Sequence, residues 1–454
     1  MSRYVDVVVV GGGTSGLQAA LQLARVGRSV VLLERRPEGR SGARWCNGVV
    51  PWQFDRAGLD RPEPPELRGR EGAAWMVSPS GRHRFAIEQS PIWEADMREL
   101  VARLQRLATD AGVEICWGTT EIGVELVGGR PVAVTARHDD APVRFRCALV
   151  VDASGRHGVV RDQVPALAAW CPPAGPADLC SAQQLTFEVA DPDGARRWLE
   201  EQGARPGDAV VAVATDGGYS TVNIKVEESL EEVSVLTGSI PALGNATGPE
   251  MLKAARDRHP WIGEPVFGGG GLIPLRRVYD RFTAPGVALV GDAACQVMAG
   301  HGSGIGFGLV AGKVLAEAVA DADDCGRAEA LWDYQARYLR EFGAIFAAYD
   351  TVRRMSVALG PDGVEELYAS GVFSPTLVLP GLEQKLGMLP PPEAARAGAA
   401  LARRPRLARI VVPALTSMGI ARLVYRAYPR RPRPRAFAAW RALARTLLPD
   451  QGDT

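Results

Sequence analysis

Cysteine and lysine are scarce in this sequence of 454 residues, and the cysteine pattern narrows what the protein can be. The seven cysteines are scattered, odd in number and contain no C-x-x-C pair. That pattern argues against a zinc knuckle and against a disulfide framework, and it is typical of a reducing compartment. We therefore expect a cytoplasmic protein without a metal site.

Long hydrophobic runs are missing as well. No stretch approaches the roughly 18 consecutive apolar residues of a membrane-spanning helix. The N-terminal MSRYVDVVVV is too short and wrongly flanked for a signal peptide. The composition, 46% hydrophobic and 23% charged, is that of a globular protein, and the length allows more than one domain.

Acidic residues are absent from one long segment. Residues 394–449 contain 13 arginines and no Asp or Glu, although the formal net charge of the chain is zero. The apolar stretch Ile410–Tyr425 lies between clusters of these arginines. Three interpretations stay open: a helix peripheral to anionic lipid, a docking face for an acidic carrier protein, or a packed helix with solvated arginines. Nucleic-acid binding is not expected, because interleaved aromatic residues and a recognised module are missing.

A βαβ unit opens the chain. The apolar run Tyr4–Val10 predicts a buried parallel strand, the spacing of apolar residues over Ser15–Val26 predicts a helix, and Ser29–Leu33 predicts a second strand. Three such elements in about 34 residues are typical of a Rossmann-type nucleotide-binding domain.

The turn between the first strand and the helix carries a G-x-G-x-x-G pattern at Gly11, Gly13 and Gly16. The glycines permit a tight turn and a close approach of pyrophosphate to the helix N-terminus. Glu34 follows the second strand and is placed to accept ribose hydroxyls, which favours FAD or NAD over NADP. We also expect cofactor contacts from the neighbouring residues Thr14, Ser15 and Arg35.

The remaining patterns divide the chain. We expect a nucleotide-binding domain in two parts, residues 1–170 and 281–345, because the apolar run GVALV at 286–290 predicts a strand that returns to the first sheet. Between them, residues 171–280 show β-rich segments with a hairpin turn at 216–218, which predicts an antiparallel β substrate domain. Residues 346–454 are expected to form a helical, Arg-rich region. The fold class is α/β.

A second glycine-rich segment, GDAACQVMAGHGSGIG, spans residues 291–306. It follows the apolar run at 286–290 and precedes a stretch with helical periodicity. A second G-x-G-x-x-G unit for a nicotinamide nucleotide is missing, since Gly268–Gly271 is followed by LIPLRR rather than by a helix.

With its Gly-Asp start and its later glycines, this segment resembles the GD motif of single-Rossmann FAD-dependent oxidoreductases of the p-hydroxybenzoate hydroxylase fold. The resemblance implies that Asp292, after Gly291, contacts a hydroxyl of the FAD ribose or ribityl chain. It also implies that backbone N–H groups of the glycine run approach the flavin pyrimidine edge, where a helix N-terminus stabilises negative charge. The residues concerned are Gly302, Ser303, Gly304 and Ile305.

Two further elements agree with that family. ALVVDASG ends an expected strand at Asp152 and is similar to the segment in which the family's strand returns to the cofactor. Arg98, near the start of the expected helix 97–111, is similar to an arginine that often contacts FAD. The resemblance covers about residues 5–320.

The loop around Cys46-Asn47-Gly48 looks like that of the geranylgeranyl reductase branch, in which a cysteine lies near the isoalloxazine. The chain departs from that branch at Ala299, where a proline is usual, and at GYSTVNI (218–224), where an aromatic motif is usual. Aromatic hydroxylases usually carry His where Cys295 stands.

The resemblance implies an FAD-dependent oxidoreductase that transfers a hydride at a carbon–carbon double bond of a hydrophobic, polyprenyl, polyene or carrier-bound substrate. NAD(P)H or a reduced carrier would supply electrons. Cys46 and His301 are the candidate catalytic residues. Two alternatives stay open: an NAD(P)H- and O2-dependent flavin monooxygenase of the same fold, and a non-catalytic FAD-bound protein that binds a carrier.

Overall fold

The computed structural model describes residues 2–448. An eight-stranded sheet forms its first layer, with the strand order β17-β18-β11-β1-β2-β8, and β10 and β9 added beside β11. Pairs β1–β2, β2–β8, β1–β11 and β11–β18 are parallel. The strands are β1 (Ser2–Val10), β2 (Val30–Leu33), β8 (Glu114–Cys116), β9 (Thr120–Val127), β10 (Arg130–His138), β11 (Ala141–Asp152), β17 (Thr283–Ala284) and β18 (Val287–Leu289).

Helices cover this sheet because its central strands are apolar on both faces. Val7, Val8 and Val9 of β1 are all fully buried, as expected for a central strand of a parallel sheet. The helices packed into the same core are α1 (Thr14–Arg25), α2 (Pro51–Ala57), α3 (Met97–Asp110), α4 (Pro165–Ala168) and α7 (Ile305–Val319). The predicted strand–helix–strand unit and the return of residues 287–289 to the first sheet are confirmed.

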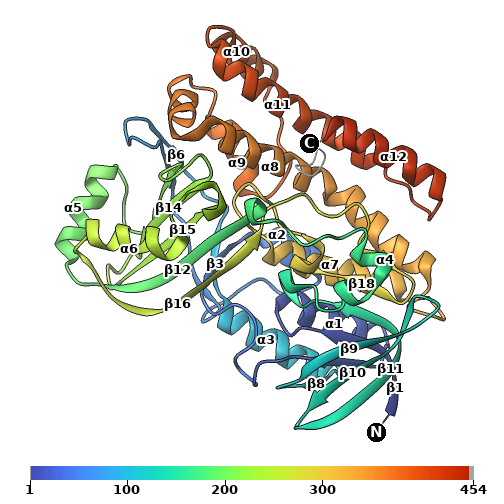
Figure 1. Cartoon of the computed structure of the whole chain (residues 1–454). Coiled ribbons are helices and arrows are strands. Elements are labelled where there is room, and N and C mark those ends of the chain that lie inside the picture. The colour runs from blue at the N-terminus through green and yellow to red at the C-terminus, as the bar shows by residue number, and fades with distance from the viewer. Residues whose placement is uncertain (1, 449–454) are drawn as a thin grey trace.

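A seven-stranded sheet forms the second layer, in the order β16-β12-β15-β14-β13-β5-β6. Its strands are β5 (Ala74–Val77), β6 (Arg84–Ile87), β12 (Leu179–Val189), β13 (Ala209–Val213), β14 (Ser220–Val226), β15 (Glu232–Ser239) and β16 (Ile262–Pro274). Helices α5 (Pro192–Gln202) and α6 (Gly248–Arg258) pack on one face with Phe187, Ile224 and Val233 (Figure 1). Strands β5 and β6 come from residues 74–87, so the early part of the chain also builds this sheet.

A small three-stranded sheet joins the two large ones. It consists of β3 (Cys46–Val49), β7 (Trp93–Asp96) and β4 (Leu67–Arg70). Short 3-10 turns lie at Gly155–His157, Arg161–Gln163, Pro176–Asp178, Pro241–Leu243 and Gly291–Ala294. The expected α/β class, with an inserted sheet and a helical C-terminal region, is confirmed; the inserted sheet is antiparallel except for the parallel pair β13–β5.

The C-terminal region is helical and extends along one side of the molecule (Figure 1). It contains α8 (Ala328–Ala369), α9 (Pro375–Leu382), α10 (Pro391–Ala402), α11 (Pro405–Arg426) and α12 (Pro434–Leu447). Helix α8 is interrupted at Gly360, which has non-helical backbone angles, because Pro361 lacks the N–H of a helical residue. Residues 449–454, the end of the Arg-rich segment, lie outside the described residues.

The sequence predicts no segment long and apolar enough to span a membrane, but helix α11 meets that criterion. Within residues 2–448 it is the one helix that is long and apolar enough to do so, with a mean hydropathy of 1.5 in its best window. Only 28% of that window is buried. Small and polar residues interrupt its apolar run, so the sequence shows no continuous apolar stretch of that length. Its inner face packs along α8, where Tyr425 lies against Gly343.

Candidate active site

One cavity of about 1090 Å³ is lined by both glycine-rich segments, although about 280 residues separate them in the sequence. It lies between the large sheets and reaches the C-terminal helices, since residues from all of these elements line it. Pockets for one small molecule usually measure about 300–1,000 Å³. The cavity is therefore slightly larger than the usual pocket for one small molecule.

The first glycine loop has the geometry of a phosphate site. The Gly11 amide donates to Leu33 O over 2.9 Å, and a Cβ at Gly11, whose φ is +109°, would lie 2.3 Å from Ala153 O. Only glycine fits there. Gly13 is open to the cavity and caps α1 without a side-chain hydrogen bond. The first N–H groups of α1 are thus left to bind an anion such as a pyrophosphate.

A carboxylate and several basic groups surround this loop. Glu34 is buried at the end of β2, where it accepts hydrogen bonds from Gly12 N (2.6 Å) and Arg36 N (2.8 Å). Each carboxylate oxygen keeps a free lone pair, so Glu34 can also accept from ribose hydroxyls. Arg35 and Arg156 line the same end of the cavity and supply positive charge for a pyrophosphate.

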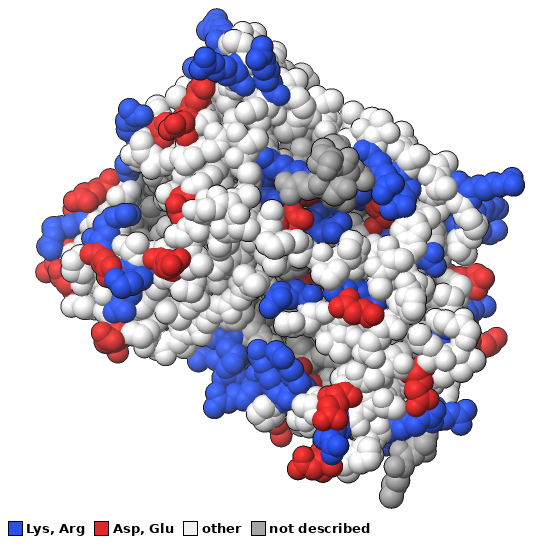
Figure 2. Space-filling model, viewed as in Figure 1, with Lys and Arg blue, Asp and Glu red and all other residues white. Residues whose placement is uncertain are grey.

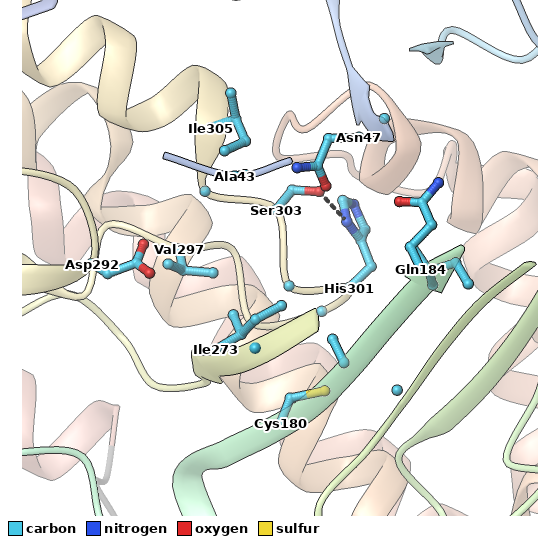
Figure 3. A pocket seen from close by; sticks show the side chains of 18 of the residues that line it. Ala43, Asn47, Cys180, Gln184, Ile273, Asp292, Val297, His301, Ser303 and Ile305 are labelled. Carbon is cyan, nitrogen blue, oxygen red and sulfur yellow. Dashed lines mark hydrogen bonds between the residues drawn. The ribbon is translucent and has the colours of Figure 1, made fainter. Parts of the chain in front are cut away.

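The second glycine segment packs directly on the first. A Cβ at Gly291 would lie 2.5 Å from Ser15 Oγ, and a Cβ at Gly308 in α7 would lie 2.1 Å from the same atom. This close approach places Asp292 in the wall of the cavity (Figure 3). Desolvation raises the pKa of Asp292 to about 6. Within residues 2–448 no protein group donates to its carboxylate, which leaves it open to a hydroxyl of a bound cofactor.

Helix α7 begins at the cavity. Its cap, Gly304, offers no side-chain hydrogen bond to the first turn, so N–H groups at the start of the helix are left for a ligand. The partial positive charge of such a helix end suits the negative pyrimidine edge of a reduced flavin. The donor groups of both loops therefore fit FAD. The expected FAD residues that line the cavity are Gly11, Gly13, Thr14, Ser15, Glu34, Arg35, Asp292, Gly302, Ser303, Gly304 and Ile305.

The other expected FAD residues are outside the lining. Gly16 and Gly291 make the close packing instead: a Cβ at Gly16 would lie 1.9 Å from Gly11 O. Asp152 is fully buried, and its carboxylate accepts from Ser154, Val160 and Arg161. We therefore revise its expected role from a cofactor contact to the support of the loop that passes under Gly11.

Arg98 is also displaced from its expected position at the cofactor. Its guanidinium makes two bonds to Asp96, of 3.0 and 2.6 Å, and lies 3.8 Å from the ring centre of Phe267. It is not among the residues that line the cavity. The arginine thus fixes the start of α3 against β16, and we revise its role accordingly.

His301 lies in the cavity wall, and both of its ring nitrogens have partners (Figure 3). Nε2 is 3.0 Å from Gly381 O in α9, and Nδ1 is 2.7 Å from Ser303 Oγ. Much of the ring surface faces the cavity, but the surrounding protein desolvates it, and this lowers its pKa. A neutral ring that donates to Gly381 and accepts from Ser303 links α9 to the second glycine loop. This arrangement favours a positioning role over proton donation.

Cys46 is buried in β3 and is absent from the cavity lining, whereas Asn47 and Gly48 are present in it. Burial, with Glu94 and Asp96 nearby, raises the pKa of the Cys46 thiol to about 12. A thiolate is therefore not formed at neutral pH, and thiolate chemistry at Cys46 is disfavoured. The structure uses Cys46 as an apolar residue behind the cavity wall.

The rest of the cavity has two different walls. The face of the seven-stranded sheet that points away from α5 and α6 contributes polar groups, among them Gln184, Asn223 and Lys225. Glu71 and Glu94 also line the cavity, and no sequence motif predicts either of them there. The opposite wall is apolar and comes from α8, α9, α11 and the segment before α9: Val352, Met355, Leu367, Phe373, Leu377, Val411, Leu415 and Met418. Among residues 2–448, no group of three or more His, Cys, Asp or Glu side chains could hold a metal ion.

Comparison with known proteins gives the same cofactor. Residues 6–161 match the family of FAD dependent oxidoreductases. The chain is 26% identical over 371 residues to the digeranylgeranylglycerophospholipid reductase of Sulfolobus acidocaldarius, covering 79% of each protein.

Solved structures share the fold. A geranylgeranyl bacteriochlorophyll reductase-like protein from Thermoplasma acidophilum superposes with a TM-score of 0.71 at 18% identity, over 91% of this chain and 100% of that one. The flavin-dependent brominase Bmp2 superposes with a TM-score of 0.60 at 15% identity, over 89% of this chain and 100% of that one. The fold therefore accommodates more than one flavin reaction.

Proposed function

We propose that the chain is an FAD-dependent oxidoreductase like the geranylgeranyl reductases it resembles, and that it reduces carbon–carbon double bonds of a polyprenyl-like substrate. When bound and reduced by an external donor such as NAD(P)H or a reduced carrier, FAD would supply the hydride for one alkene carbon, and the other carbon would take up a proton. The protein holds the cofactor, shapes the substrate chamber and excludes water.

The observation that carries this proposal is the continuity of the cavity. The glycine loops that fit FAD and the apolar wall from the C-terminal helices line one cavity. A long apolar chain can lie along that wall with a double bond near the second glycine loop. Burial of each methylene there contributes about 0.8 kcal/mol, which suits a substrate with an extended hydrocarbon chain.

We further propose roles for individual residues. Glu34 and the first glycine loop hold the adenylate end of FAD, and Asp292 with Gly302–Ile305 holds the flavin end. His301 positions the second loop through its bonds to Gly381 and Ser303. These assignments rest on the cavity lining and on the open hydrogen-bonding groups at each position.

Anaerobic reoxidation tests the reaction. The holoenzyme is photoreduced without oxygen and mixed with geranylgeraniol, and the flavin absorbance and the product mass are followed. We expect flavin reoxidation and a product heavier by two hydrogen atoms per reduced bond. Oxygen uptake matched to NAD(P)H consumption, with a hydroxylated product, would instead identify a monooxygenase. Absence of reoxidation by any alkene would favour a non-catalytic FAD protein.

A matched pair of variants in α11 tests the chamber. Leu415 lines the cavity, whereas Leu423 on the same helix is 67% exposed. Leu415→Trp should fill part of the chamber and slow reoxidation by geranylgeraniol at least tenfold without loss of flavin. Leu423→Trp should leave the rate unchanged. Equal rates in both variants would place the substrate elsewhere.

We also propose that α11 rests on an anionic lipid surface, from which an apolar substrate can enter. Its outer face carries Val412 (47% exposed), Thr416, Gly419 and Leu423, and its inner face lines the apolar end of the cavity. Arginines gather at both ends of the helical arm, near α10 and where α11 leads into α12 (Figure 2). Charge of this kind contributes about 1 kcal/mol per arginine at an anionic membrane.

Vesicle sedimentation tests this surface, with phosphatidylcholine vesicles prepared with or without phosphatidylglycerol. Binding should need the anionic lipid and should weaken with salt. Replacing Arg409 and Arg422 by Gln should lower the partition coefficient by roughly 30-fold, from about 1 kcal/mol each. Leu423→Glu should also reduce binding, whereas Val127→Glu, on β9 and 68% exposed, should not. Unchanged sedimentation together with capture of an acidic carrier protein would replace the lipid by that partner.

A further inference from the structure

The sheet face that lines the cavity places its side chains in rows. The strand registers align Gln184 with Leu236 and Leu236 with Asn223 across β12, β15 and β14. All three residues line the cavity. Because neighbouring strands are about 4.8 Å apart, Gln184 and Asn223 lie roughly 10 Å apart in one row, with an apolar side chain between them.

Two amide groups in this row have unused acceptors. Asn223 Oδ1 and Gln184 Oε1 are buried, and within residues 2–448 neither has a hydrogen-bond partner. Gln184, only 8% exposed, donates through Nε2 to Ser234 Oγ over 3.0 Å, and this bond fixes the orientation of its amide. A buried carbonyl oxygen without a donor is unfavourable, so each of these groups is suited to a ligand that brings one.

The next row toward one end of the cavity is charged and mostly acidic. Lys225 is 2% exposed, and its Nζ lies 2.6 Å from Glu94 Oε2 and 3.2 Å from Glu227 Oε1. Glu71 lines the same end and accepts from Ser90 Oγ over 2.6 Å. Three carboxyl groups thus face one ammonium group. Lys225 is already engaged by two of them and is not available to a phosphate.

The opposite neighbouring row leaves space. Ala182, Gly238 and Thr221 stand side by side in β12, β15 and β14, and all three line the cavity. Small side chains there allow an extended molecule to pass across the sheet toward the amide row. The wall therefore changes from small and apolar, through two open amides, to an acidic end.

We propose that Gln184 and Asn223 form a subsite for an uncharged hydroxyl group of an otherwise apolar substrate, and that the acidic cluster beside it excludes phosphate esters. This inference rests on the proposed function and narrows its substrate class to neutral isoprenoid-like alcohols. A hydroxyl donates to the open amide oxygen and brings no charge against the carboxylates. A phosphate in the same place would face the carboxyl groups of Glu71 and Glu94.

Equilibrium titration of the oxidised holoenzyme tests the subsite without turnover. Three probes are compared by flavin difference absorbance: geranylgeraniol, the hydrocarbon in which a methyl group replaces its CH2OH, and geranylgeranyl monophosphate. We expect the alcohol to bind about tenfold more tightly than the hydrocarbon, the typical contribution of one hydrogen bond. The monophosphate should bind more weakly than the alcohol.

Near-isosteric variants assign the preference to the two amides. In the double variant Asn223→Leu with Gln184→Met, the alcohol and the hydrocarbon should bind equally. Met76→Leu, in the same row of the sheet at β5, should keep the wild-type preference. A preference for the alcohol that survives the double variant, or its absence in the wild type, would overturn the subsite. Tighter binding of the monophosphate would overturn it as well.

The outcomes separate this inference from the proposed function. Equal binding of alcohol and hydrocarbon, with normal alkene reduction, would overturn the subsite alone. Failure of both probes to bind would overturn the proposed substrate class and the subsite with it. Reduction of the alcohol with loss of preference in the double variant supports both.

Discussion

Gly312→Ala is expected to loosen the contact between α1 and α7, and with it the site. A Cβ at Gly312 would lie 2.7 Å from Ala19 N and 2.9 Å from Ala19 Cα, and these backbone atoms cannot rotate away. Ordinary contacts begin near 3.4 Å, so α7 has to move by roughly 0.7 Å. The same movement separates Ser15 from Gly308 of α7, beside the contact between Ser15 and Gly291 where the two glycine segments meet.

The size of the effect follows from two opposed contributions. Overpacking of this kind costs about 1–3 kcal/mol, and the better helix propensity of alanine returns about 1 kcal/mol. The net loss is therefore up to about 2 kcal/mol. For 454 residues the entropy of unfolding is about 1 kcal/mol per kelvin, so a cooperative melting temperature should fall by up to about 2 °C. Flavin retention should fall more clearly, because both loops contribute to it.

A glycine in open space provides the control. Gly419 lies inside α11 with no atom within 4 Å of an added Cβ, so Gly419→Ala should raise stability by up to about 1 kcal/mol. Melting is followed by circular dichroism at a fixed FAD concentration, and the flavin-to-protein ratio is measured after gel filtration. If Gly312→Ala melts at or above the wild-type temperature and keeps its flavin, the packing argument is wrong.

Three other substitutions probe single side chains. Glu34→Ala should lower flavin content after gel filtration, and unchanged content would exclude a ribose contact. Burial and the neighbouring Glu94 raise the pKa of Glu71 to about 7 against the opposing effect of Lys225, so its ionisation disfavours the folded state. As the pH rises from about 4.5 to 7, the free energy of unfolding of the wild type should therefore fall relative to that of Glu71→Gln, by at most about 3 kcal/mol. A constant difference between the urea midpoints of the two proteins across that pH range would contradict this. His301→Gln should retain more activity than His301→Phe, because glutamine can keep the hydrogen bond to α9. The acidic limb of the pH–activity profile should stay where it is in the wild type. Equal losses of activity in the two variants would argue against a positioning role.

Several features could be predicted from the sequence because they depend on neighbours in the chain. The loop at Gly11 requires a positive φ and close approach to the next strands, and only glycine satisfies both. The apolar run of β1 and the helical spacing of α1 are local as well. The pairing of both glycine segments in one FAD site was also predictable, through resemblance to a family in which the two occur together.

Individual side chains were predicted less well, because other groups of the folded protein compete for them. Asp152 is occupied by amides of the following loop, Arg98 is held by Asp96 and Phe267, and Cys46 is absent from the cavity lining. A motif gives the position of such a residue in the chain. It does not give the direction of its side chain or the groups that compete for it.

The sequence alone determined the α/β architecture and the cofactor, because the patterns that predict strands, turns and helices each occupy a short segment of the chain. The tertiary structure decided the substrate side. The row that holds Gln184 and Asn223 exists only through the register of three strands, and its apolar counterpart exists only because α11 docks on α8. Strand register and helix docking depend on packing across the whole molecule, and no local pattern encodes them.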